Sequence, residues 1–313
     1  MTTIKNVAVA GAAGTIGRPI VTHLLASNLF TKITVLTRDA SRPLPFPPGS
    51  IIIKQVDYSS LSSLESALRG CDAAVSALSF DAISNQTLLV KAAANVGTVK
   101  RFIPSEYGND TLNPLLATIP IYQPKIAIRS LCEQLAVSHP SFSWTTIQNA
   151  SFLAADWTLD FIVDVKNRRA DIKDGGDVLF CATTYEDVAQ AVVGVLMNLE
   201  ETANRPVRTS SVETTQNDIV SIAKDTLVEL EGVGKGKDWT VTYSRTEELE
   251  AQARKRWAEG DRSEEVVAMF INRAFIGEGW GGYFPVRDNG LLGIKGIGRE
   301  GLKRIVKERL GME

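Results

Sequence analysis

Val7-Ala-Val-Ala-Gly-Ala-Ala-Gly-Thr-Ile-Gly17 is the stretch that decides the fold, because an apolar strand passes into a helix within it. Gly11 permits a sharp turn without a Cβ penalty, Gly14 lets the backbone approach a ligand, and Gly17 lets the helix pack closely on the strand. The N–H groups at the start of such a helix face an anion. A glycine-rich turn without a ligand has the same pattern, but the preceding strand and the following apolar periodicity favour a pyrophosphate site.

Segments typical of strands and helices alternate over the first half of the chain, which predicts β-α-β units and a mostly parallel sheet. Short continuous apolar runs such as Ile51-Ile-Ile suit strands that are buried on both faces. The expected strands are Asn6 to Ala10, Lys32 to Thr37, Ile51 to Val56, Ala73 to Ala77, Arg101 to Pro104 and Trp144 to Gln148. The expected helices include Leu61 to Arg69 and Asn85 to Val96. The sequence therefore predicts an α/β fold, a doubly wound parallel sheet of Rossmann type.

After about residue 150 this alternation weakens, so we expect two regions. Residues 1–150 would form a dinucleotide-binding Rossmann domain, and residues 151–313 a smaller α+β substrate-binding region interleaved with its sheet. The elements expected there are strands at Val178 to Ala182, Val207 to Ser210 and Trp239 to Tyr243, and helices at Tyr185 to Leu199, Arg245 to Glu259 and Glu264 to Phe275. Glu231 to Asp238 is expected to be a loop. Gly277 to Pro285 is glycine-rich and aromatic, so it would be flexible and either flank a pocket or cap the fold.

Composition limits the partners of the chain. Its 313 residues carry 34 Lys and Arg against 36 Asp and Glu, a net charge of −2 that attracts neither nucleic acid nor anionic lipid. Three cysteines (Cys71, Cys132, Cys181) and two histidines predict neither a disulfide framework nor a metal site. The sequence has no signal-peptide pattern and no apolar run near the ~18 residues of a membrane span, so the expected location is the cytosol, as a monomer or homodimer.

The end of the second expected strand selects the cofactor, because it lies beside the adenosine ribose in a Rossmann unit. Arg38 offers a guanidinium that can grip a 2′-phosphate and stack on adenine, and Arg42 would add positive charge. In the competing interpretation, Asp39 accepts from a free 2′-OH and Arg38 lies in solvent. NADP is favoured over NAD, since an acid that binds the ribose sits at the strand end itself. Asp57 would either hydrogen-bond the adenine amino group or serve a turn.

Five segments together resemble the NmrA-like and isoflavone-reductase-like branch of the atypical short-chain dehydrogenases. They are Gly11 to Gly17, Thr37-Arg38, Arg101-Phe-Ile-Pro-Ser-Glu-Tyr-Gly108, Lys125 and Thr184-Tyr-Glu-Asp-Val-Ala189. The resemblance covers nearly the whole chain and is closest over its first half. It implies an NADPH-binding protein; many members reduce aromatic natural products of secondary metabolism, and others are redox-sensing regulators without chemistry.

The resemblance implies that Lys125 is the catalytic residue. Pro124 suits the first position of a helix, so Lys125 would lie in the first turn, where the helix dipole disfavours an ammonium. A desolvated lysine there would exchange protons near neutrality. Two alternatives stay open: a charged Lys125 that only holds the nicotinamide ribose hydroxyls, and an exposed lysine without a role.

Several other residues are candidates for the site. Tyr122 is three residues from Lys125 rather than four, with a proline between them, so packing at the helix entry is favoured over a substrate contact. Ser105 and Glu106 end the fifth strand, where Ser105 would hydrogen-bond a carbonyl or the nicotinamide and Glu106 would equally cap the next element. The expected cofactor contacts are Gly11, Ala13, Gly14, Thr15, Ile16, Gly17, Arg38, Arg42, Asp57, Ala77, Leu78, Lys125, Asn149 and Phe152. The expected substrate contacts are Ser105, Tyr122, Trp157, Trp280 and Tyr283.

The leading hypothesis is an NADPH-dependent reductase that passes hydride to a carbonyl, imine or activated double bond of a small aromatic or polycyclic substrate. An NADP-binding redox sensor without catalysis is the first alternative. A redox-neutral isomerase or cyclase on the same scaffold is the second.

Overall fold

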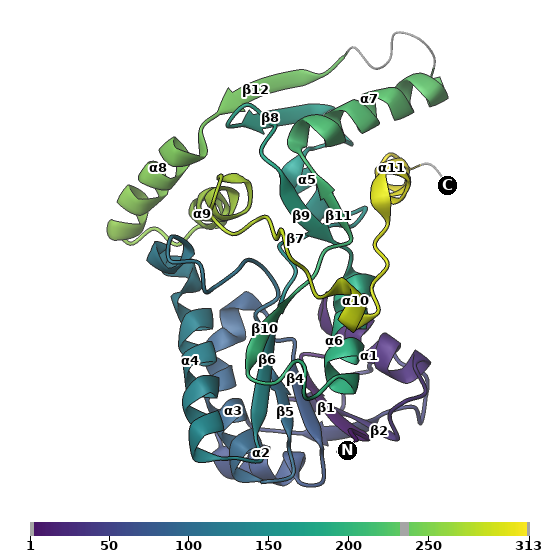
Figure 1. Ribbon diagram of the computed structural model, residues 1–313, viewed down its shortest axis with the longest axis vertical. Helices are drawn as coiled ribbons and strands as arrows, with labels where there is room; N and C mark the ends of the chain where they lie inside the picture. The colour runs from purple at the N-terminus through teal and green to yellow at the C-terminus, as the bar shows by residue number, and fades with distance from the viewer. Residues whose placement is uncertain (1–2, 232–237, 312–313) are drawn as a thin grey trace.

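A seven-stranded parallel sheet forms the larger part of the molecule, in the strand order β10-β6-β5-β4-β1-β2-β3 (Figure 1). The computed structural model describes residues 3–231 and 238–311. The strands of this sheet are β1 (Asn6–Ala10), β2 (Lys32–Thr37), β3 (Ile52–Gln55), β4 (Ala73–Ser76), β5 (Arg101–Ile103), β6 (Ser143–Gln148) and β10 (Arg205–Arg208). The predicted Rossmann-type α/β class is confirmed, with every early strand within two residues of its expected bounds.

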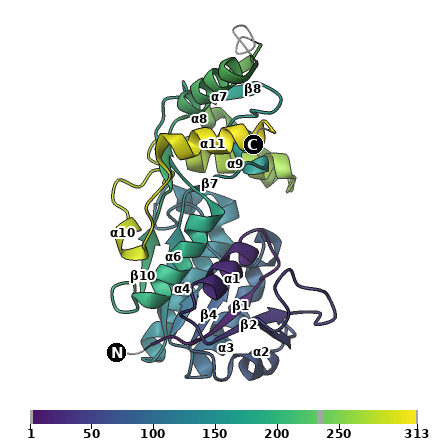
Figure 2. The same ribbon diagram turned by 90° about the vertical axis from the view of Figure 1, so that its right-hand side faces the viewer.

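Helices cover both faces of the sheet. On one face lie α1 (Gly17–Ala26) and α6 (Tyr185–Met197), which stand side by side in Figure 2. On the other face lie α2 (Leu61–Leu68), α3 (Gln86–Asn95) and α4 (Gln123–Ser138). The central strand β1 shows why its sequence is apolar throughout: Val7 and Val9 pack into the core under α1 and α6, whereas Ala8 and Ala10 pack into the opposite core.

The glycine turn connects β1 to α1, and two of its glycines are required by packing. Gly11 has φ +77°, and a Cβ on it would lie 2.3 Å from the Ala77 carbonyl oxygen. A Cβ on Gly17 would lie 2.0 Å from the Gly11 carbonyl oxygen. A Cβ on Gly14 would lie 3.2 Å from that same oxygen and 3.9 Å from the Ala77 carbonyl oxygen, so it would be less crowded. Backbone packing in the turn therefore requires glycine at positions 11 and 17.

Gly17→Ala is expected to lower the free energy of unfolding by about 1–3 kcal/mol, because the new methyl group collides with backbone that cannot move aside. Gly290→Ala is the matched control, since nothing lies within 4 Å of a Cβ there; its effect should stay within about 0.5 kcal/mol. Urea unfolding of the three proteins measures the difference. Equal stabilities for both variants would contradict this account of the turn.

The second region lies above the Rossmann sheet in Figure 1. It contains one three-stranded sheet, β11-β9-β7, and one two-stranded sheet, β12-β8. Its strands are β7 (Ser151–Phe152), β8 (Arg169–Lys173), β9 (Phe180–Thr183), β11 (Val212–Thr214) and β12 (Thr240–Ser244). Its helices are α5 (Trp157–Ile162), α7 (Gln216–Glu231), α8 (Thr246–Ala258), α9 (Glu264–Ile276) and α11 (Gly298–Arg309), while the short α10 (Asn289–Leu292) packs on α6. The described part of the chain also contains three 3-10 helices: η1 (Phe80–Asn85), η2 (Leu116–Thr118) and η3 (Pro120–Tyr122).

The chain returns to the Rossmann sheet after residue 150, since α6 and β10 belong to it. The strand expected at Val207 to Ser210 begins two residues earlier. The sequence did not predict β7, β8, β11, α5, α7, α10 or α11. Most of the loop expected at Glu231 to Asp238 lies outside the described residues. No helix in the described part of the chain is both long and apolar enough to cross a membrane.

Candidate functional site

The carboxyl ends of β1, β4, β5 and β6 meet at one edge of the sheet, where open α/β folds bind their ligands. The glycine turn follows β1, and Ala77 and Leu78 follow β4. Ser105 and Glu106 follow β5, and Asn149 follows β6. The fold therefore brings candidates from four separate segments to the same edge.

The crest of the glycine turn is open to a ligand. Ala13, Gly14 and Thr15 are exposed, whereas Gly17 is buried. The residue before α1, Ile16, gives the helix no side-chain cap. The first N–H groups of α1 thus have no capping side chain, which is the arrangement that binds a phosphate at a helix N-terminus.

Local hydrogen bonds to Ser41 hold the Asp39 carboxylate. This carboxylate accepts hydrogen bonds from the Ser41 hydroxyl at 2.6 Å and from the Ser41 N–H at 2.9 Å, and these bonds lower the pKa of Asp39. Arg38 and Arg42 are both exposed, and Arg38 forms no ion pair within residues 3–231 and 238–311. An unpaired guanidinium at this strand end is suited to an anion such as a 2′-phosphate.

Asp57 also uses its carboxylate locally. It accepts from the Ser59 hydroxyl at 2.6 Å and from the Ser59 N–H at 2.8 Å, which forms a turn before α2 and lowers the pKa of Asp57. The turn alternative that the sequence left open for Asp57 is therefore realised in this structure.

Lys125 lies in the first turn of α4. The helix begins at Gln123, so Pro124 is its second residue rather than its first, and Tyr122 precedes the helix. The partly buried Lys125 donates from Nζ to the main-chain carbonyl of Glu106. Burial lowers the pKa of Lys125 to about 8, and the nearby Glu106 carboxylate limits this decrease.

Glu106 is buried beside Lys125, and only 3% of it is exposed. Its Oε2 accepts from the Thr111 hydroxyl at 3.0 Å, whereas its Oε1 has no partner in the described part of the chain. Burial raises the pKa of Glu106 to about 7, against the opposing effect of Lys125. The expectation that Glu106 caps the next element is not realised, because that element is η2, whose N-cap residue is Leu115 and which has no side-chain cap.

Strained backbone joins the ends of β5 and β6 behind Lys125. Tyr107 has φ +24° and Ala150 has φ +53°, backbone conformations that residues other than glycine rarely adopt. The N–H groups of Asn149 and Ala150 both donate to the Gly108 carbonyl, at 3.0 and 2.9 Å. The fully buried Asn149 keeps its Oδ1 without a partner among the described residues. Unpaired buried groups and strain of this kind mark functional sites.

Ser105 hydrogen-bonds to neighbouring segments of the fold through both its hydroxyl and its N–H. Its hydroxyl donates to the Leu78 carbonyl at 2.8 Å, and its N–H donates to the Gln86 side chain at 2.7 Å. These bonds fasten the end of β5 to the segment after β4. Ser105 thereby positions the strand end that carries Glu106.

The aromatic candidates lie in different surroundings. Tyr122 and Trp280 are buried in one apolar cluster between α4 and α9, where the Arg273 guanidinium lies 4.7 Å from the Trp280 ring. Tyr283 is 38% exposed, and Phe152 packs against the Tyr185 ring. Trp157 begins α5, but its side chain lies outside the described residues. The segment Gly277 to Pro285 is packed rather than open, because Trp280 and Phe284 are buried within it.

Sequence reasoning missed three residues that support the site: Gln86, Thr111 and Arg129. Arg129 is four residues after Lys125 and therefore lies on the same face of α4, a spacing that was visible in the sequence. Gln86 and Thr111 gave no comparable signal, since only the folded loop brings them to Ser105 and Glu106.

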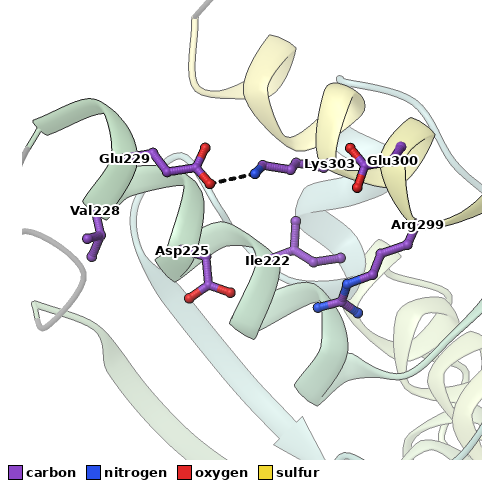
Figure 3. Close-up of a pocket in the computed structure, with 7 residues that line it drawn as sticks. All are labelled: Ile222, Asp225, Val228, Glu229, Arg299, Glu300 and Lys303. Carbon is purple, nitrogen blue, oxygen red and sulfur yellow. Dashed lines mark hydrogen bonds and ion pairs between the residues drawn. The ribbon is translucent and has the colours of Figure 1, made fainter.

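Two hollows lie away from this edge. One of about 410 Å³ lies between α7 and α11, where Lys303 pairs with Glu229 (Figure 3). The other, of about 620 Å³, borders β8, β12 and α8. Neither is lined by Lys125 or by the glycine turn. Within residues 3–231 and 238–311, no group of three or more His, Cys, Asp and Glu side chains is arranged to hold a metal ion.

Comparison with known proteins gives consistent matches. Residues 3–229 match the model of the NmrA-like family. Oxidoreductase poxI of Penicillium oxalicum is 30% identical over 301 residues, which cover 91% of this chain and 88% of the relative. Oxidoreductase aprR of Aspergillus flavus is 33% identical over 264 residues, which cover 82% of this chain and 83% of the relative.

Two solved structures share the fold. The structure of AtPrR2 with NADP+ and (+)pinoresinol has a TM-score of 0.76 at 22% identity. The match covers 97% of this chain and 99% of the AtPrR2 chain. The binary complex of leucoanthocyanidin reductase with NADPH, from Vitis vinifera, has a TM-score of 0.74 at 23% identity and covers 96% and 99%. These similarities agree with the Rossmann-type architecture described above.

Proposed function

The chain belongs to the NmrA-like family, as its motifs predicted, and from this premise we propose that it is an NADPH-dependent reductase. Two relatives at 30% and 33% identity are named oxidoreductases. The observation that carries the proposal is the desolvated Lys125 ammonium, held on the Glu106 carbonyl at the ligand-binding edge of the sheet.

The residues at this edge fit an NADP(H) molecule. The exposed turn crest and the uncapped start of α1 would hold the pyrophosphate, and the unpaired Arg38 would hold the 2′-phosphate. The unpartnered Oδ1 of Asn149 would accept from the nicotinamide end. We propose NADPH as the cofactor on these grounds.

NADPH bound at this edge supplies a hydride. The contribution of the protein's own residues is proton transfer. The Lys125 ammonium donates a proton from Nζ to the substrate atom that becomes electron-rich, and Lys125 is left as a neutral amine. A pKa near 8 keeps the ammonium populated at neutral pH while making it a better acid than an exposed lysine. The Glu106 carbonyl holds Nζ in place for this transfer.

We propose a small aromatic or polycyclic substrate with a carbonyl, imine or activated double bond. Its support is the set of half-exposed apolar side chains on segments near this edge, namely Phe80, Leu112, Leu115 and Tyr283. The Tyr283 segment borders the loop after β5, since a Cβ on Gly281 would lie 3.5 Å from Asp110. Such surfaces bind flat apolar compounds.

A panel of aromatic ketones, imines and enones tests the proposed function. With the wild-type chain, at least one compound should be reduced with loss of NADPH, and NADH should be a poorer cofactor. Tight NADPH binding without loss of NADPH across the panel would favour the redox-sensor alternative.

The pH dependence of kcat is expected to show loss of activity above pH about 8. The proton donor is the ammonium, so activity is full below the pKa of Lys125 and falls about tenfold per unit above it. Measurement of kcat between pH 6 and 10 (roughly the range over which a lysine of lowered pKa titrates) tests this directly. A profile that rises through this range would mean that Lys125 acts as a base.

A further inference from the structure

The Glu106 carboxylate forms no ion pair with either of two nearby cations of α4, Lys125 and Arg129. Lys125 and Arg129 are one helical turn apart on the same face. Lys125 binds the main-chain carbonyl of Glu106, and Arg129 Nη2 reaches the main-chain carbonyl of Thr111 at 3.5 Å. Arg129 Nη1 is directed instead to the Glu133 carboxylate at 3.4 Å. The buried carboxylate of Glu106 is therefore not neutralised by a direct arginine contact.

The placement of this carboxylate is specified by the fold. Ser105, immediately before it, is tied to Gln86 and Leu78, and Thr111 donates to its Oε2. Its other oxygen has no partner among the described residues. A buried, partly unsatisfied carboxylate lowers the free energy of unfolding. A protein retains such a group where the group has a function.

We propose that Glu106 is the positioning residue that keeps Lys125 protonated: the negative charge of its ionised carboxylate offsets the desolvation of the ammonium. This inference rests on the proposed function and deepens it. A lysine buried without such a partner loses its proton well below its ordinary pKa and could no longer act as the acid.

The other charged and titratable groups around the pair act more weakly. Asp110 raises the pKa of Glu106, but its carboxylate is paired with Arg208 at 2.7 Å. Arg129 lowers the pKa of Glu106. Cys132, on the same helix, is buried and has a pKa raised by burial, so it stays a neutral thiol. Glu106 is the carboxylate that opposes the fall in the pKa of Lys125, and its main-chain carbonyl accepts from Nζ of the same lysine.

Glu106→Gln is the test. It keeps the shape and the main-chain carbonyl but removes the charge, so the pKa of Lys125 should fall by about one unit or more. The decline of kcat should move to lower pH by the same amount, with activity recovered at acidic pH. Glu186→Gln, an equal charge change at an exposed position on α6, should leave the profile unchanged.

A second readout does not depend on turnover. In protein labelled with ¹³C at lysine Cε, the Lys125 resonance, assigned from its loss in Lys125→Met, gives the pKa of Lys125 directly. Failure of the reductase assay with a shifted titration would overturn the proposed function and support the role of Glu106. A wild-type titration in Glu106→Gln would overturn the role of Glu106 whatever the activity.

Thr111→Val provides the same test if Glu106→Gln does not fold. It removes the hydroxyl that stabilises the carboxylate and keeps the volume of the side chain. The Lys125 titration should shift in the same direction by a smaller amount, and an unshifted titration would contradict the inference.

Discussion

Lys125→Met is expected to lower kcat by about 10²–10⁴-fold at neutral pH, because it removes the proton donor and keeps the length of the apolar stem. The Kd for NADPH should stay within about threefold if proton transfer is the main role of Lys125, since a lost charged hydrogen bond to the cofactor would cost more than this. Steady-state kinetics and equilibrium binding of NADPH measure the two quantities on the same protein.

The binding measurement separates this role from the alternative that Lys125 only holds the nicotinamide ribose. In that case Kd would rise by tenfold or more, and the pH dependence of kcat would persist in the variant. Lys91→Met is the matched control, because Lys91 is exposed on α3 and lies outside the proposed site. Unchanged kcat in Lys125→Met would remove Lys125 from the mechanism.

Arg38→Ser is expected to raise the Kd for NADPH by about 10–100-fold, because charge-assisted hydrogen bonds to a phosphate contribute about 1.5–3 kcal/mol. The Kd for NADH should change little, since NADH has no 2′-phosphate. The two affinities can be compared by the quenching of protein fluorescence on titration with each cofactor.

Arg69→Ser is the control for the loss of one positive charge, because Arg69 is exposed at the end of α2. Arg42→Ser should give a smaller rise in Kd than Arg38→Ser, since Arg42 lies in the loop after the strand end. Equal losses of affinity for NADPH and NADH in Arg38→Ser would mean that Arg38 does not select the 2′-phosphate.

The Rossmann half could be predicted because its information is local. The β1 strand has the bounds that its apolar run predicted, and the glycine spacing located the turn to α1. The exposed Arg38 at the end of β2 was also visible in the sequence, because a strand end has a fixed place relative to the turn.

The second region was harder to predict because its strands are short and pair over long distances. The β8 strand pairs with β12 about 70 residues later, and the three residues of β11 pair with β9. The role of Glu106 was hidden for the same reason: Gln86 holds the neighbouring Ser105, and Thr111 and Lys125 bind Glu106 itself, all from other parts of the chain. No periodic pattern in the sequence indicates that these residues come together.

The central claim is that this chain uses NADPH to reduce its substrate. Turnover with NADPH deuterated at the transferred position, followed by mass spectrometry of the product, tests it most directly. The account predicts one deuterium in the product for each NADPH consumed. Product formed without deuterium and without loss of NADPH would contradict it and identify a redox-neutral isomerase or cyclase.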